Sequence, residues 1–481
     1  TIGAAGTATI VAGIPFYSDS SNNSIYTHDV SGTDSTAENN TAYGFAAMDA
    51  ITTGDKNVAV GKGSLGALTT GEHNIGIGFN AADGFDTETG NIAIGSNALG
   101  GGSLSGGEEN VAIGYAALDA LTSGDANVAI GDLAGSAITT GGSNVFIGND
   151  AGLLCTSAGG VIFIGTRAGD GHDTETNNLG IGKDSLGGAI NGGEYNVAIG
   201  NETFEDLTSG DYNIAIGYQA GKEMQSGARN VMIGHRAGDN ITASSSNVII
   251  GDEAIGTGVL TGEQNVVVGR NAGQDMTSAT KNVFLGFEAG LNATTSDGNV
   301  IIGHEANGAG VLTGANNVVI GKLAGNDMTS ANQNVLIGED AGANITEADA
   351  NVIIGQGAGE AVTTGGSNIL VGVNAGNSFD AETHNLAIGH TALSGSVAGG
   401  EFNVAIGSYA GDALTSSDHN VMVGYNAGTD ITGGGSIEGQ NALFGNYAGA
   451  NITNGYQNTC LGYQSAAGEG DGVGADITTG Y

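Results

Sequence analysis

The sequence has few of the residues that build a thick globular core. Among 481 residues there are one Pro, no Trp and two Cys, and aromatic side chains make up 5%. So few bulky side chains predict a thin fold. The two cysteines, Cys155 and Cys460, fall on apolar columns of the repeat described below. We therefore expect them to be buried hydrophobic residues rather than a disulfide or a metal site.

Positive charge is also scarce, because 10 Lys and Arg stand against 50 Asp and Glu, for a formal charge of −40. Too few cations are present to replace the counterions of a phosphate backbone, which excludes nucleic acid as a main partner. No run of about 20 apolar residues exists, so no membrane span is expected. No basic segment precedes an apolar one at the start, so any secretion signal has been removed or lies outside this sequence.

What the sequence does contain is a repeat. A motif of the form Asn-Val-x-Ile-Gly recurs 25 times, with its Gly at positions from Gly44 to Gly462 and a period of 17 residues with occasional insertions. Gly is abundant, with 91 residues, but it follows no triplet pattern and Pro is nearly absent, so the chain is not collagen-like. A single repeat has too little apolar surface to fold alone, whereas stacked copies make a continuous core.

The repeat predicts an all-β fold, a β-solenoid (β-roll) of about 25 coils over residues 40–481, with a non-repeat N-terminal arm at residues 1–39. Numbered from its Asn, one repeat reads NVAIGDLAGSAITTGGS over residues 127–143, with aliphatic residues at positions 2 and 4 and Gly at position 5. A strand followed by one helical turn would also fit this length. Gly at position 9 and the following Thr-Thr-Gly disfavour a helix, so we favour the β-coil.

Three columns of the repeat have structural interpretations. Position 12 is an apolar stripe, as in Ile51, Leu68 and Met224. Position 1 is Asn in every repeat except Val161, and we interpret this Asn as tolerating a left-handed turn while its amide binds the Asn of the next coil. Thr at positions 13 and 14 is interpreted in the same way.

Position 3 lies between the two aliphatic positions of the strand. If positions 2 and 4 point into the coil, position 3 must point outwards. An outward apolar ladder of this length predicts burial against identical neighbours, most simply around a shared axis. The predicted interface consists of Phe146, Phe163, Met232, Ile249, Val267, Phe284, Ile301, Val319, Leu336, Ile353, Leu370 and Met422.

The step Asn-Val-Ala-Ile-Gly at Asn110, Asn127, Asn196 and Asn403 resembles the head repeats of trimeric autotransporter adhesins (YadA-like heads) and related tail-fibre repeats. The resemblance extends from residue 40 to residue 462. It implies left-handed β-rolls with three chains packed in parallel. The repeat of those heads is shorter than the 17 residues found here, and the sequence has neither a coiled-coil stalk nor a membrane anchor.

The two ends of the sequence suggest longitudinal assembly. Residues 1–16 form an apolar, β-branched arm that could add a strand to a neighbouring subunit. The last coils carry no charged or helical cap, and solenoids usually need one to block end-on addition. We therefore expect head-to-tail stacking.

Candidate sites for small ligands are few. Paired acids recur at positions 13 and 15 and could present two carboxylates to Ca²⁺, although we favour the interpretation as solvated turn acids: Asp86 with Glu88, Asp173 with Glu175, and Asp380 with Glu382. The eight histidines fall on different columns and are interpreted as surface residues. No other cofactor is indicated, and no pairing of a nucleophile with a base suggests an enzyme.

Glycosylation sequons at Asn240, Asn292 and Asn344 share one column, so glycans there would line one side of the solenoid, although chance in an Asn- and Thr-rich chain also accounts for them.

The leading functional hypothesis is a structural subunit of an extracellular or cell-surface filament or fibre, which is not an enzyme and whose partner is itself, in a homo-oligomer or polymer with three chains as one option. The alternative is an adhesin or a phage or bacterial tail-fibre head that binds a surface receptor. A third function, ice binding through the Thr column, is disfavoured because a flat, regular Thr-x-Thr array is lacking.

Overall fold

The structure is a computed structural model that describes residues 8–11, 14–19, 23–27, 36–101, 106–395, 399–431, 439–453 and 456–466. The chain divides into two compact units, residues 1–243 and residues 244–481. Within both units the described elements are β-strands, and no helix occurs among the described residues. The predicted all-β solenoid with a 17-residue repeat is confirmed.

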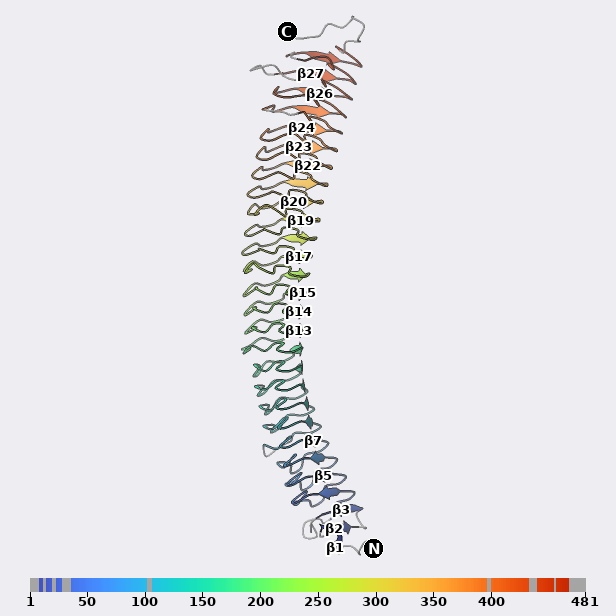
Figure 1. Ribbon diagram of the computed structural model, residues 1–481, viewed down its shortest axis with the longest axis vertical. Coiled ribbons are helices and arrows are strands. Elements are labelled where there is room, and N and C mark those ends of the chain that lie inside the picture. The colour runs from blue at the N-terminus through green and yellow to red at the C-terminus, as the bar shows by residue number, and fades with distance from the viewer. Residues whose placement is uncertain are drawn as a thin grey trace. The chain divides into compact units, whose positions relative to one another are not determined.

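The described residues of the first unit form fifteen strands, most of them three residues long (Figure 1). They are β1 (Ala8–Val11), β2 (Ile14–Asp19), β3 (Ser24–Tyr26), β4 (Thr41–Tyr43), β5 (Val58–Val60), β6 (Ile75–Ile77), β7 (Ile92–Ile94), β8 (Val111–Ile113), β9 (Val128–Ile130), β10 (Val145–Ile147), β11 (Ile162–Ile164), β12 (Leu179–Ile181), β13 (Val197–Ile199), β14 (Ile214–Ile216) and β15 (Val231–Ile233).

In the part of the second unit that the structure describes there are thirteen strands of three residues each. They are β16 (Val248–Ile250), β17 (Val266–Val268), β18 (Val283–Leu285), β19 (Val300–Ile302), β20 (Val318–Ile320), β21 (Val335–Ile337), β22 (Val352–Ile354), β23 (Ile369–Val371), β24 (Leu386–Ile388), β25 (Val404–Ile406), β26 (Val421–Val423), β27 (Ala442–Phe444) and β28 (Thr459–Leu461).

Consecutive coils pair their strands in parallel and in register within each unit. In β10 and β11, Val145 lies opposite Ile162, and Phe146 opposite Phe163. Each position of the repeat therefore forms a column along the unit, and the strands follow one another along one side of the stack (Figure 1). The β-branched residues of the motif suit such a pleated parallel ladder.

The interior of the coil is filled from positions 3, 8, 9 and 12. The predicted apolar stripe at position 12 is confirmed, since Ile51, Leu68 and Met224 are fully buried. Cys155 shares this column, and both it and Cys460 are buried free thiols, as expected.

The predicted orientation of position 3 is wrong. All twelve residues assigned to an oligomer interface, from Phe146 to Met422, have an exposed fraction of 0% within the single chain. They point into the coil, while positions 2 and 4 point outwards. Side chains alternate between the two faces of a strand. If position 3 points inwards instead of positions 2 and 4, every apolar residue of the strand therefore moves to the other face. These twelve residues therefore cannot form a lateral contact in this structure.

Positions 3 and 9 fill the interior jointly. Where position 3 is Ala59, position 9 is Leu65, and where position 3 is Phe146, position 9 is Gly152. A Cβ added to Gly152 would lie 2.3 Å from Phe146 Cε1, so a larger residue has no room there. In these two coils a small residue at one position therefore accompanies a large residue at the other.

The Asn column forms a ladder of buried hydrogen bonds along each unit, interrupted at Val161 in the first unit. Asn127 Oδ1 accepts from the backbone N–H of Asn144 at 3.1 Å and from its Nδ2 at 2.9 Å. Asn144 Nδ2 also donates to the carbonyl oxygen of Ala158 at 2.8 Å. The predicted bonding between coils is confirmed. The left-handed backbone lies one residue earlier, as at Ser143 with a φ of 62°, and not at the Asn itself.

The one break in this ladder, at Val161, is accompanied by a buried histidine. His172 is 0% exposed, which corrects its interpretation as a surface residue. Its Nε2 lies 3.3 Å from Asn178 Nδ2, in place of the Asn oxygen that Val161 lacks. The ring also packs edge-on against Phe163, with the two centroids 4.6 Å apart. Burial lowers the pKa of His172 to about 3, offset in part by the backbone of Leu186.

The N-terminal strands pair within the chain. β1 pairs antiparallel with β2, β2 antiparallel with β3, and β3 parallel with β4, so they extend the ladder of the first unit by its N-terminal end. Strand addition of this arm to another subunit stays a prediction. Residues 467–481, which belong to the predicted uncapped end, lie outside the described residues.

Candidate functional site

The most distinctive surface of each unit is the outer side of its strand column. We call it the sheet face and define it as positions 2 and 4 of each repeat, together with position 6 and the residue directly before the next Asn. Positions 2 and 4 of the strands from β4 to β28 carry no charged residue, and all are apolar except Thr41 and Thr459.

These outward residues are only partly covered by their neighbours along the column. Exposed fractions are 38% for Ile130, 36% for Ile216, 45% for Leu285 and 43% for Ile369. A contiguous apolar patch larger than a few hundred Å² is unusual on a soluble monomer and marks an interaction surface. Sequence reasoning missed this face because it placed positions 2 and 4 inside the coil, although the absence of charged residues at these positions was visible.

Charge is distributed unevenly between the sheet face and the rest of the chain. The face holds seven of the ten Lys and Arg but only four of the fifty Asp and Glu, so it carries a formal charge of +3 and the rest carries −43. The cations are Lys56, Lys62, Lys183, Arg229, Arg270, Lys281 and Lys322, and the acids are Glu109, Asp132, Asp252 and Glu339. In the first unit the face carries +2 and the remainder −22, and in the second unit +1 and −21.

Aromatic rings gather along the two margins of this face. Tyr195 and Tyr212 stack with centroids 5.1 Å apart and planes 6° from parallel. In the second unit Phe402 lies between His384 and His419, at 4.8 and 5.1 Å. Such pairs stabilise neighbouring coils by about 0.5–1.5 kcal/mol beyond the area they bury.

A second aromatic ladder in the second unit runs over consecutive coils beside the strands. Each ring contacts the next at centroid distances between 5.3 and 6.2 Å. Its members are His390, Tyr409, Tyr425, Tyr447 and Tyr463.

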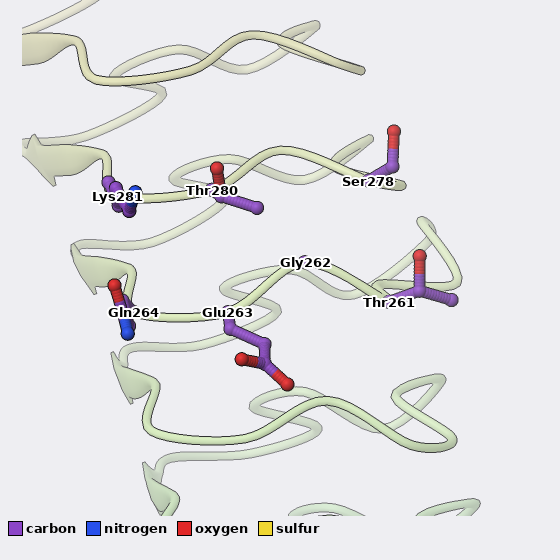
Figure 2. A pocket seen from close by; sticks show the side chains of 7 residues that line it. All are labelled: Thr261, Gly262, Glu263, Gln264, Ser278, Thr280 and Lys281. Atoms are coloured by element: carbon purple, nitrogen blue, oxygen red, sulfur yellow. The ribbon is translucent and has the colours of Figure 1, made fainter.

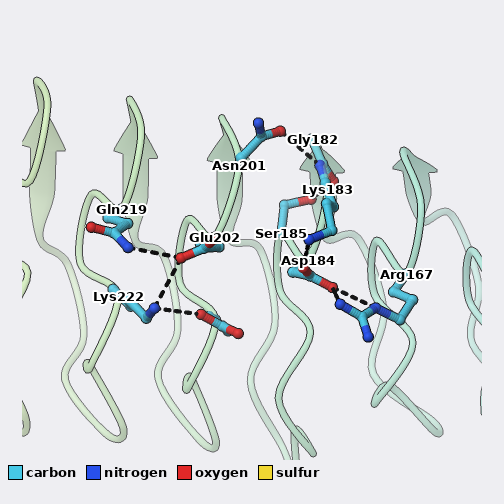
Figure 3. A network of polar contacts seen from close by, with 10 residues as sticks. Arg167, Gly182, Lys183, Asp184, Ser185, Asn201, Glu202, Gln219 and Lys222 are labelled. Atoms are coloured by element: carbon cyan, nitrogen blue, oxygen red, sulfur yellow. Dashed lines mark hydrogen bonds and ion pairs between the residues drawn. The ribbon is translucent and has the colours of Figure 1, made fainter.

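Several cations of the first unit are held by acids of neighbouring coils (Figure 3). Arg167 donates to Asp184, with Nε 2.7 Å from Oδ1. Lys222 Nζ lies 2.9 Å from Glu202 Oε2 and 3.0 Å from Glu205 Oε2. The hydrogen bond to Glu202 raises the pKa of Lys222, and Gln219 and Lys222 together lower the pKa of Glu202. These half-exposed ion pairs link neighbouring coils.

The acids proposed as calcium ligands do not converge on one point. Glu175 is 4% exposed, and its Oε2 accepts from the backbone N–H of Asp173 at 3.1 Å and of Thr174 at 3.2 Å. Its Oε1 accepts from the N–H of Gly192 in the next coil at 2.9 Å. Asp173 instead accepts from the Thr156 hydroxyl and is exposed.

Glu88 and Glu382 repeat this arrangement, with Gly106 and Gly399 as the donors of the next coil. Asp86 and Asp380 accept from Thr69 and Thr363. Among the described residues no three His, Cys, Asp or Glu side chains are grouped to hold a metal. Calcium binding stays a prediction, which a calcium-dependent shift in melting temperature would test.

The three sequon residues share position 11 of their coils, as expected. Asn344 is exposed, whereas Asn240 and Asn292 are half-buried. Asn292 Nδ2 donates to the carbonyl oxygen of Gly308 at 3.0 Å, which ties that amide to the next coil. Glycosylation stays a prediction.

The second unit has a polar hollow of about 530 Å³ between two consecutive coils. Figure 2 shows its lining side chains spread along the two turns rather than converging. They belong to Thr261, Gly262, Glu263, Gln264, Ser278, Thr280 and Lys281. The hollow holds no pair of nucleophile and base.

No protein-family model matches the chain, and no curated protein or solved structure is significantly similar to it. The resemblance to YadA-like heads therefore stays a prediction. Among the described residues no helix is long and apolar enough to cross a membrane.

Proposed function

We propose that the chain is a structural subunit of an extracellular filament or fibre, which assembles by lateral packing of its sheet face on another copy. The observation that carries this proposal is the uncharged, partly exposed aliphatic column along each unit, in a chain with 50 acidic residues. Selection for solubility alone would place some of those acids at positions 2 and 4.

The size of the face supports a stable contact. At about 4.8 Å per coil, the eleven strands from β5 to β15 form a column on the order of 50 Å long. A contact roughly 15 Å wide over this length buries about 750 Å² per partner, which is the size of a standard specific interface.

Head-to-tail stacking and an extracellular or cell-surface location belong to the same proposal. The parallel ladder can continue from one subunit to the next by the same hydrogen bonds that join its coils. The resemblance to fibre-forming adhesin heads points in the same direction. A structural role assigns no catalytic residue to the chain.

Charge placed on the sheet face tests the proposal. The double variant Ile199→Lys with Ile216→Lys puts two ammonium groups on adjacent coils, where assembly would bury them. Lateral association, measured by sedimentation, should therefore be lost. The variant Ser209→Lys with Ser226→Lys makes the same charge change at exposed position 14 and should associate as the unmodified protein does. Equal association of both variants would contradict the proposed surface.

A second candidate function is an adhesin or tail-fibre head, and the ladder from His390 to Tyr463 favours it, because exposed aromatic rings are typical of binding surfaces. Binding of the full chain to cells or immobilised glycans, lost on replacing Tyr409 and Tyr425 with Ser, would support this function. Binding that survives these changes would count against that ladder.

A further inference from the structure

The sheet face differs from every other side of the repeat in its charge. With +3 on the face and −43 elsewhere, two copies that meet through any other surface bring strongly negative coats together. Two sheet faces meet without that repulsion.

We propose that the chain assembles laterally as a closed pair, with the sheet face of one copy packed on the same face of a second copy and no further lateral growth. The inference rests on the proposed function, because it names the partner and the number of chains that the sheet face accepts. A self-complementary contact of this kind is isologous, with the same patch on both subunits.

The geometry of the face favours two chains over three. Its strands form one layer in register, and outward aliphatic side chains such as Val335 and Val352 repeat at constant spacing. A single layer of strands can pack its whole width on one partner sheet, with the two sheets about 10 Å apart as in stacked sheets. Around a threefold axis, each face would be divided between two neighbours and would meet each of them over only part of its width.

Pairing also leaves only the acidic surfaces exposed. Residues beside the face margins carry acids, as at Asp150, Asp340, Asp125 and Asp211. A third copy that approaches the pair therefore meets negative charge on both sides, and lateral growth stops. This differs from an open fibre bundle and from the three-chain arrangement of the adhesin heads that the sequence resembles.

Salt dependence distinguishes apolar pairing from ionic pairing. Repulsion between the acidic coats is screened as the Debye length falls from about 30 Å at 0.01 M to about 8 Å at 0.15 M ionic strength. Apolar pairing of the sheet faces should thus tighten with salt, by roughly tenfold over this range, whereas a contact held by surface ion pairs would weaken.

The test measures the number of chains in cross-section for the full-length protein. Light scattering gives the mass of discrete particles, and scanning transmission electron microscopy gives the mass per unit length of filaments joined end to end. We expect twice the chain mass of 47.0 kDa, or twice the mass per length of one chain. Val335→Lys with Val352→Lys should halve that value, while the control Ser330→Lys with Thr364→Lys should leave it unchanged. Circular dichroism of all variants checks that the solenoid is retained.

The outcomes separate the two proposals. A cross-section of three or more chains would overturn the closed pair. If the Lys variant still prevented that association, lateral packing through the sheet face would stand. Single chains at every salt concentration would overturn both. Pairing that weakens as salt rises would also contradict the closed apolar pair.

Discussion

At the scale of single residues, the Gly at position 5 is required by the close approach of the next coil. A Cβ on Gly148 would lie 2.4 Å from the carbonyl oxygen of Gly165, and its φ of +137° disfavours any other residue. The motif therefore fixes its Gly through sterics, not through chemistry at a ligand site.

Gly148→Ala should destabilise the protein by about 3 kcal/mol, since backbone strain adds to a clash that the neighbouring backbone cannot avoid. The midpoint of denaturant unfolding measures the effect. Gly159→Ala is the matched control, because its added Cβ meets nothing closer than the Gly142 oxygen at 3.7 Å. Equal midpoints for the two variants would refute the steric account.

The Asn ladder makes a separate prediction. Asn282→Ala removes the acceptor of the Asn299 backbone N–H, now 2.9 Å away, and the donor to the Ser296 carbonyl at 2.8 Å. Each buried group left without a partner costs about 1–3 kcal/mol, so the loss should reach roughly 2–5 kcal/mol. Asn149→Ala, at an exposed position, should change the unfolding midpoint little. A small effect of Asn282→Ala would show that the ladder is dispensable.

His172 should make stability depend on pH. Its pKa falls from 6.5 to about 3 on folding, so between these values the unfolded chain takes up a proton that the folded chain excludes. The contribution of this residue is fully present above pH 6.5 and is lost progressively as the pH falls towards 3. His172→Leu, which restores the apolar character of position 12, should flatten the melting temperature over this window. The exposed His73→Gln serves as control, and identical pH profiles for all three proteins would contradict the burial of a neutral imidazole.

At the scale of the coil, the insertions in three of the six longer coils follow a buried carboxylate. Glu175 binds the backbone N–H groups of its own turn and that of Gly192, in a coil one residue longer than the repeat. Glu88 and Glu382 do the same beside the longer coils that contain Gly106 and Gly399. In these coils the buried Glu and the insertion that follows it form one structural unit, in which the carboxylate binds backbone N–H groups of both coils.

Glu175→Ala should lower the free energy of unfolding by about 2–4 kcal/mol, because three backbone N–H groups lose a charged acceptor. The exposed Glu223→Ala should have an effect below about 0.5 kcal/mol. Hydrogen exchange would locate the change at Asp173, Thr174 and Gly192. Unchanged protection of these three amides in the Ala variant would argue against this role of the Glu175 carboxylate.

The repeat, its period, the apolar column at position 12 and the bonding between Asn residues could be predicted from the sequence, since each rests on a column that stacking must preserve. The face of the strand could not be read from its alternation, because positions 2, 3 and 4 are all apolar and either parity looks acceptable. The pairing of Ala59 with Leu65 and of Phe146 with Gly152 points to the buried orientation of position 3, because two residues that pack inside the same coil must share its volume. The roles of His172 and Glu175 depend on contacts between coils that no single repeat displays.

At the scale of the whole molecule, the function proposed here follows from the segregation of charge away from the sheet face. Electron cryomicroscopy of the assembled protein in cross-section tests this most directly. The account predicts two strand columns facing each other at about 10 Å, with outward residues such as Ile337 between them and Leu336 inside its own coil. Particles whose sheet faces remain open to solvent, or which meet through their acidic surfaces, would contradict it.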